Sequence, residues 1–190
     1  MSLRLTGSLA LAFVLTAGAS AWASGDQPAR GQSRGFAQPE GLQPVKAELI
    51  AEHASVRPGG QTRVGVSFEL EEGWHIYAKE PGDAGLPTKI TWSGPKSVRF
   101  GPLQWPVPQQ FDEPGSIRTF GYSGAVVLAS RLSVSSQAKA GEPIQVAAKV
   151  EWLACKEICV PGSATLELTL PVSKAGPTLS THAEFFDHTG

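Results

Sequence analysis

The sequence predicts an all-β protein whose single domain is an immunoglobulin-like antiparallel β-sandwich. Short segments in which apolar and polar residues alternate follow one another along the chain, and no stretch sustains the 3.6-residue period of a long helix. Turn signals, among them Pro81-Gly82, Pro114-Gly115 and Pro161-Gly162, separate these segments at the short intervals typical of a sandwich. The 21 glycines and 15 prolines among 190 residues also agree with a chain that turns often.

Eight strands are predicted within the domain. The clearest is Thr62–Glu71, whose apolar residues fall on one face at the period of two expected of a half-buried strand. These residues are Val64, Val66, Phe68 and Leu70. The other seven candidates, in chain order, are Val45–His53, Trp74–Lys79, Lys89–Trp92, Val98–Phe100, Ala125–Val134, Ile144–Leu153 and Ala164–Leu170.

Three further segments complete the predicted organisation. Residues 24–44 are rich in Gly, Pro, Gln and Ser and show no periodicity, which predicts a flexible linker before the sandwich at residues 45–173. Residues 174–190 are expected to form a C-terminal tail, in which the Phe185-Phe186 pair offers an apolar group for docking. Residues 1–23, at the other end, have the composition of a targeting segment.

The N-terminal segment is typical of a secretory signal peptide. Arg4 is the only charged residue before Asp26, and the apolar stretch Leu5–Ala23 follows it. This stretch ends in Ala21-Trp22-Ala23, which matches an A-x-A cleavage site. The alternative is an uncleaved membrane anchor, but the small residues near the end of the stretch favour cleavage. We therefore expect an exported protein, in which a disulfide is permitted.

The composition excludes several classes of function. The chain carries 16 Lys+Arg against 17 Asp+Glu, for a formal net charge of −1 at pH 7, so a broadly basic nucleic-acid binder is excluded. A hydrophobic content of 41% is enough to build a core and excludes wholesale disorder. The chain contains no P-loop, Rossmann glycine pattern or zinc-protease histidine motif, and we expect no small-molecule cofactor.

The two cysteines, Cys155 and Cys159, are the residues with the clearest chemical potential. In a fully extended chain, four residue steps would place their Cα atoms roughly 13 Å apart, whereas a disulfide needs about 4.4–6.8 Å. Lys156-Glu157-Ile158 must therefore turn the chain if the cysteines pair. A hairpin with a three-residue loop and a single helical turn both satisfy this requirement.

The spacing alone leaves three uses of the cysteine pair open. An inert staple would close a ring of about five residues, which stabilises a fold by only about 2 kcal/mol in the chain-entropy model. A redox couple at a hairpin tip would be accessible to thiol–disulfide exchange. The third use is copper binding, because C-x-x-x-C followed by a proline resembles Sco-type copper chaperones and thiolates suit copper(I). The histidines available to such a site are His75, His182 and His188, although those chaperones have an α/β fold that this sequence does not predict.

Several short motifs occur in the order found in a known family. The chain resembles the N-terminal periplasmic domain of the thiol:disulfide interchange protein DsbD, particularly its ScsB-like branch, over roughly Val45–Val172. The motifs that carry this resemblance are Gly73-Trp-His-Ile-Tyr77, Pro81-Gly-Asp-Ala-Gly-Leu-Pro-Thr88, Trp105-Pro-Val-Pro108, Phe120-Gly-Tyr122 and the segment from Cys155 to Gly162.

The resemblance implies a function and a set of site residues. It implies that Cys155 and Cys159 form a redox couple at one end of an immunoglobulin-like sandwich, with Cys159 as the cysteine that a partner attacks. It also implies a cap loop that shields the couple, and the order of the motifs places this loop at Phe111, Asp112 and Glu113. The alternative for the two acidic residues is an exposed polar turn.

The resemblance further implies protein partners and a location. Members of the family exchange disulfides in the periplasm with thioredoxin-like proteins, and they receive electrons from a membrane-embedded protein. The sequence ends soon after the domain, without membrane helices or a C-x-x-C motif, so we expect either that these partners act in trans or that the domain has been reused for another role. The expected activity is that of a protein-disulfide reductase-type redox carrier. The competing class is a non-catalytic binding module with a structural disulfide.

Overall fold

The computed structural model describes residues 42–187. The expected signal peptide at residues 1–23, and all but the last three residues of the expected linker at residues 24–44, lie outside the described residues. Within residues 42–187, no helix is long and apolar enough to cross a membrane.

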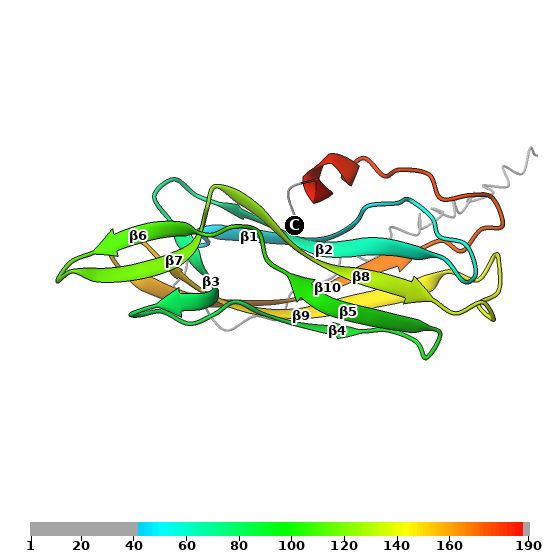
Figure 1. Cartoon of the computed structure of the whole chain (residues 1–190), viewed down its shortest axis with the longest axis horizontal. Helices are drawn as coiled ribbons and strands as arrows, with labels where there is room; N and C mark the ends of the chain where they lie inside the picture. Colours follow the sequence, from blue (N-terminus) through cyan, green and yellow to red (C-terminus); the bar gives the residue numbers. More distant parts are fainter. Residues whose placement is uncertain (1–41, 188–190) are drawn as a thin grey trace, which may run out of the picture. The chain divides into compact units, whose positions relative to one another are not determined.

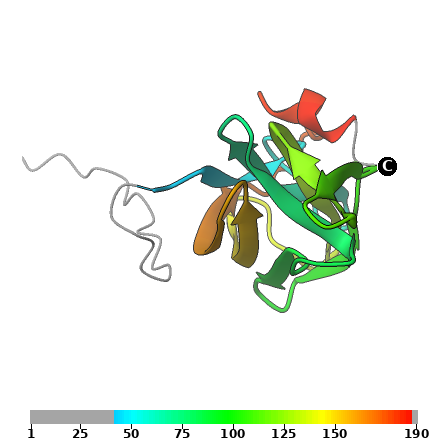
Figure 2. The ribbon, with the colours of Figure 1, turned by 90° about the vertical axis from the view of Figure 1, so that its left-hand side faces the viewer.

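The described residues form two antiparallel sheets packed face to face (Figure 1; Figure 2). One sheet has the strand order β1-β2-β8-β5, and the other has the order β10-β9-β3-β7-β6, with β4 also pairing with β9. The strands are β1 (Val45–Ala51), β2 (Gln61–Leu70), β3 (His75–Gly82), β4 (Lys89–Ser93), β5 (Val98–Gln104), β6 (Gln109–Glu113), β7 (Ile117–Ser123), β8 (Ala125–Val134), β9 (Ile144–Cys155) and β10 (Cys159–Leu170). The two-sheet, nearly all-β architecture confirms the expected fold class.

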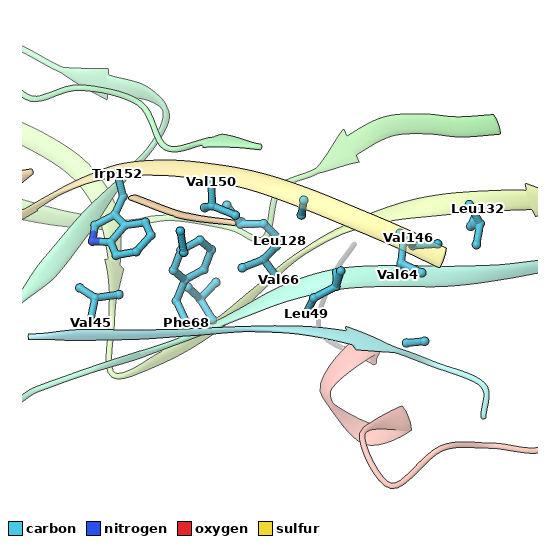
Figure 3. Close-up of a cluster of buried hydrophobic side chains, with 14 of the residues drawn as sticks. Val45, Leu49, Val64, Val66, Phe68, Leu128, Leu132, Val146, Val150 and Trp152 are labelled. Carbon is cyan, nitrogen blue, oxygen red and sulfur yellow. The ribbon is translucent and has the colours of Figure 1, made fainter. Parts of the chain in front are cut away.

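The core lies between the two sheets and follows directly from the alternation in the sequence. Val64, Val66 and Phe68 of β2 are fully buried, as the period of two predicts. On the facing sheet, alternate residues of β9 also point inward, and Trp152 meets Phe68 edge to face with ring centroids 5.8 Å apart (Figure 3). The burial of Phe68 and Trp152 together contributes several kcal/mol, at about 25 cal/mol per Å² of apolar surface.

Strand β9 organises its sheet because it pairs along both edges. Along one edge it pairs with β10 over its whole length, from Ile144 to Cys155. Along the other edge it pairs first with β4, at residues 147–151, and then with the start of β3. The last pairs are Ile76 with Ala154 and His75 with Cys155. This sharing of an edge brings the beginning of β3 beside the end of β9.

The structure adds a hairpin that the sequence did not predict. Strands β6 and β7 pair from Gln109–Gly121 to Glu113–Ile117. The expectation of a loop over Phe111 to Glu113 is therefore wrong, because these residues end β6. The alternation is weak here because β6 is the outermost strand of its sheet and has one apolar residue, Phe111, among five.

The expected turn at Pro161-Gly162 is also wrong, because both residues lie inside β10. Strand β10 is an edge strand, and a proline without an N–H group is tolerated at such an edge. Gly162 lies opposite Trp152, and a Cβ atom at Gly162 would fall 2.3 Å from Trp152 Cε2. The glycine therefore makes room for the indole ring.

The C-terminal segment lies along the outer face of the β1-β2-β8-β5 sheet (red in Figure 1). The backbone of Ser180 donates to Glu52 O at 2.9 Å, and the 3₁₀ helix η1 (Ala183–Phe186) follows. Phe186 is fully buried in a small apolar cluster with Ile50, Val127 and Ala129. One member of the Phe185-Phe186 pair thus docks on the domain.

Phe186→Ala should lower the free energy of unfolding by about 3 kcal/mol, because it removes a fully buried aromatic ring and leaves a cavity. The matched control is Phe185→Ala, which removes a ring that is 45% exposed and should cost less than about 1 kcal/mol. Chemical denaturation of the two variants and the wild type measures both values. Equal losses in the two variants would contradict the assigned anchoring role of Phe186.

Candidate functional site

The two cysteines form a disulfide at the tip of the β9–β10 hairpin. Cys155 is the last residue of β9 and Cys159 the first of β10, and they are direct partners in the strand register. Their Cα atoms are 4.1 Å apart. The Lys156 amide donates to Ile158 O at 3.0 Å and closes the loop between them. The chain therefore turns by a three-residue hairpin loop and not by a helical turn.

The disulfide belongs to a row of residues that crosses the sheet. Cys159 on β10 is opposite Cys155 on β9, Cys155 is opposite His75 on β3, and His75 is opposite Ser123 on β7. Residues directly opposite one another in an antiparallel sheet project from the same face. The neighbouring residue Ile76 is buried in the main core, so the row projects from the outer face of the sheet.

A second layer of side chains covers part of this outer face. The Phe111 ring stacks on the His75 ring, with centroids 4.4 Å apart and planes at 17°. Tyr77, two residues along β3, meets the same imidazole edge to face at 5.1 Å. The loop after β3 covers Tyr77, since a Cβ atom at Gly85 would lie 2.3 Å from the tyrosine ring. These contacts bury His75 and Tyr77, which are 5% and 4% exposed, outside the main core.

The two cysteines differ in their exposure to solvent. Cys155, beside His75, is only 3% exposed, whereas Cys159 is exposed to solvent at the edge of the sheet. Ile158 in the loop is also exposed, at 59%. The Lys156 ammonium donates to Glu72 O at 3.1 Å, which fixes the loop against the turn before β3. A reagent in solution therefore meets Cys159 and not Cys155.

The electrostatics of the outer layer centre on His75 and Glu113. The Nε2 atom of His75 lies 3.7 Å from Glu113 Oε1 and is buried without a hydrogen-bond partner among the described residues. Burial lowers the pKa of His75 below its usual value, and the Glu113 carboxylate opposes this shift only in part. Burial also raises the pKa of Tyr77, with the Glu113 charge adding to the effect. The imidazole is therefore neutral near pH 7.

The structure brings two of the three expected cap residues to the site. Phe111 stacks on His75 and Glu113 faces it, both from the end of β6 in the β6–β7 hairpin at the left of Figure 1. Asp112 does not join them, because its side chain is 78% exposed and accepts a hydrogen bond from Gln110 Nε2 at 3.0 Å. The alternation of side chains along β6 explains this difference.

Sequence reasoning considered His75 only as a histidine available to a copper site, and not as a neighbour of the cysteine pair in a redox site. The period of two along β3 places His75 and Tyr77 on one face, but nothing in the sequence indicates that β3 pairs with the end of β9. The other histidine considered for a copper site, His182, lies on the C-terminal segment and packs against Phe185. Among residues 42–187, no three His, Cys, Asp or Glu side chains gather in a group that could hold a metal ion. His188 lies outside the described residues.

The lowered pKa of His75 predicts a pH dependence of stability. The unfolded chain binds the histidine proton more tightly than the folded protein, so acidification below the unfolded pKa of about 6.5 destabilises the fold. His75→Phe should remove this contribution while keeping an aromatic ring against Phe111. Denaturation at several pH values measures the difference in the free energy of unfolding between the wild type and the variant. As the pH falls, the free energy of unfolding of the wild type should decrease relative to that of the variant. A difference between them that does not change with pH would contradict the assignment.

Comparison with known proteins places this geometry in context. A search of curated proteins finds no significant match. The N-terminal periplasmic domain of ScsB from Proteus mirabilis is similar in structure, with a TM-score of 0.56 and 19% identity over 83% of this chain and 60% of that one. The reduced N-terminal domain of Neisseria meningitidis DsbD matches with a TM-score of 0.35 and 13% identity, over 70% of this chain and 89% of that one. The chain thus spans three-fifths of the ScsB structure.

The match to a family model covers most of the described sandwich. The model for the N-terminal part of the thiol:disulfide interchange protein DsbD matches residues 43–171. This range contains both sheets and the hairpin that carries the disulfide. The chain belongs to the family of DsbD N-terminal domains, and its fold is the immunoglobulin-like sandwich of that family.

Proposed function

We propose that this chain is an exported thiol:disulfide interchange domain that relays electrons through the Cys155–Cys159 couple. The observation that carries the proposal is the unequal exposure of the two sulfur-bearing residues, because Cys159 is exposed and Cys155 is 3% exposed. Such a disulfide offers one sulfur to a partner and protects the other. The activity is that of a protein-disulfide reductase-type carrier, which accepts electrons from one protein and passes them to another.

The chemistry proceeds by two thiol–disulfide exchanges. In the reduced protein, the Cys159 thiolate attacks a disulfide of an oxidised partner, forms a mixed disulfide and expels one partner thiolate. The Cys155 sulfur then attacks the Cys159 sulfur, closes the intramolecular disulfide and releases the second partner thiol. The same steps in reverse, which begin when a reduced partner attacks Cys159, reduce the Cys155–Cys159 disulfide again.

The location of the disulfide argues against a staple as its main role. Strands β9 and β10 already pair over 12 residues, so the backbone ladder fixes their register without the covalent bond. A ring with a sequence separation of 4 adds only about 2 kcal/mol by restricting the unfolded chain. A bond at an exposed loop is, in contrast, well placed for exchange.

The proposed cap consists of Phe111 and Glu113 at the end of β6. Phe111 covers His75, which is the neighbour of Cys155 in the sheet, so the two residues shield the buried half of the couple. The expected third cap residue, Asp112, has no role in this arrangement because its side chain faces solvent.

The proposed partners follow from family membership. The matched family is named for a thiol:disulfide interchange protein, and the similar ScsB structure is a periplasmic domain. We therefore propose that the protein works in the periplasm with thioredoxin-like proteins and with a membrane electron-transfer protein. The exposed loop residue Ile158, next to Cys159, gives a partner an apolar contact beside the reactive sulfur.

Single cysteine variants test the assigned roles. Cys155→Ser should accumulate a mixed disulfide with an oxidised thioredoxin-like protein, because Cys159 can attack but no second thiol of this chain releases the partner, and only the partner's own freed thiol can reverse the step. Cys159→Ser should accumulate far less, because the remaining thiol is buried. Non-reducing electrophoresis with mass spectrometry measures the trapped species. The double variant is the matched control for non-covalent binding, and equal trapping in both single variants would contradict the assignment.

A further inference from the structure

His75 is a buried histidine whose position gives it a part in the exchange reaction. It is the direct cross-strand partner of Cys155, and opposite residues in an antiparallel pair have Cβ atoms about 4.5–5.5 Å apart. We propose that His75 is the base that removes the proton from the Cys155 thiol when this thiol closes the disulfide with Cys159. This inference rests on the proposed exchange function and deepens it.

The surroundings of His75 suit a base. The stacked Phe111 ring and the edge-on Tyr77 ring fix the plane of the imidazole. Its Nε2 atom is buried, has no hydrogen-bond partner among the described residues and lies 3.7 Å from the Glu113 carboxylate. The carboxylate stabilises the imidazolium that forms when His75 accepts a proton. Many proteins activate a nucleophile in this way, with a base beside the nucleophile and a third group that supports the base.

The buried site of Cys155 creates the need for such a base. Only the thiolate form of cysteine attacks a disulfide. Cys155 is 3% exposed, so water and hydroxide reach its thiol poorly. Cys159 is exposed and exchanges its proton with solvent directly. The base is therefore needed for the resolving step and not for the first attack.

The resolving step balances in protons and electrons. Neutral His75 takes the proton of the Cys155 thiol and becomes imidazolium beside Glu113. The Cys155 thiolate attacks the Cys159 sulfur of the mixed disulfide, the bond to the partner breaks, and the partner leaves as a thiolate. The couple loses two electrons and the partner disulfide gains them. The imidazolium then returns its proton to the leaving thiolate or to water.

Among the described residues, titratable groups on three strands lie beside His75. Glu113 faces it from β6, Tyr77 from its own strand and Cys155 from β9, while Ser123 on β7 does not titrate. Burial favours the neutral imidazole, and the carboxylate of Glu113 works in the opposite direction. The base is therefore present in its proton-accepting form near neutral pH.

The test follows the two steps separately with a small aromatic disulfide, 5,5′-dithiobis(2-nitrobenzoate). When the fully reduced protein is in excess, attack by Cys159 releases one coloured thiolate, and resolution by Cys155 releases the second. The second phase is intramolecular, so its rate does not depend on protein concentration. Stopped-flow absorbance resolves both phases between about pH 6 and pH 9, a range that includes the ordinary cysteine pKa near 8.5.

His75→Phe should slow the second phase about a hundredfold at neutral pH, at the low end of what a positioned base contributes. The first phase should keep its wild-type rate. The deficit should shrink as the pH rises, because the hydroxide concentration increases tenfold per pH unit and partly offsets the poor access of hydroxide to the buried thiol. Glu113→Gln should give an intermediate rate, since the imidazolium then lacks its counter-charge.

Further variants separate the proposal from a structural effect. His75→Gln keeps a polar group without a base and should show the same slow second phase if His75→Phe fails to fold. His182→Gln changes a histidine on the C-terminal segment and should leave both phases unchanged. A uniform slowing at every pH would assign His75 a packing role and overturn the proposal.

The outcomes also distinguish this inference from the proposed function. If both His75 variants keep the wild-type second phase and its pH profile, exchange through the couple stands and the role of His75 is overturned. If the reduced wild-type protein releases only one thiolate per reagent, the couple does not resolve, and the proposed function fails together with the inference.

Discussion

The pairing of β9 with strands on both of its edges is the constraint on which the site depends. The register with β10 sets Cys155 opposite Cys159, and the register with β3 sets Cys155 opposite His75. Alternation along β9 then sends Trp152 and Ala154 into the core and turns Cys155 to the outer face. A shift of one residue in either register would bury the disulfide in the core or separate it from the histidine.

The pairing of β9 also places the site on the outer face of its sheet, which is exposed to solvent in most sandwiches. The β6–β7 hairpin and the loop after β3 cover His75 and Tyr77 there, apart from the main core. Within this layer the His75 Nε2 atom has no hydrogen-bond partner among the described residues, at a cost of about 1–3 kcal/mol. A buried polar atom without a partner needs a physical explanation, and a catalytic or redox role is one of those known from native proteins. The unpaired His75 nitrogen therefore lowers the stability of the fold at the residue to which we assign the proton transfer.

The sequence allowed prediction of the features that depend on local pattern. Alternation identified β2 and β9, and the spacing of Cys155 and Cys159 restricted their connection to two geometries, of which the hairpin is present. Features that depend on long-range pairing were missed. Strand β6 lacks alternation because it lies at an edge, and the importance of His75 arises from a partner 80 positions away in the chain. The burial of Phe186 depends likewise on a distant sheet.

The reduction potential of the Cys155–Cys159 bond tests the claim that this bond is an exchange couple and not a staple. The purified protein is equilibrated in thiol buffers of graded potential, and the reduced fraction is measured by alkylation. An exposed disulfide in a short hairpin loop should have a potential of roughly −120 to −270 mV, the range of exchange proteins. A potential below about −300 mV is typical of structural disulfides and would contradict the claim.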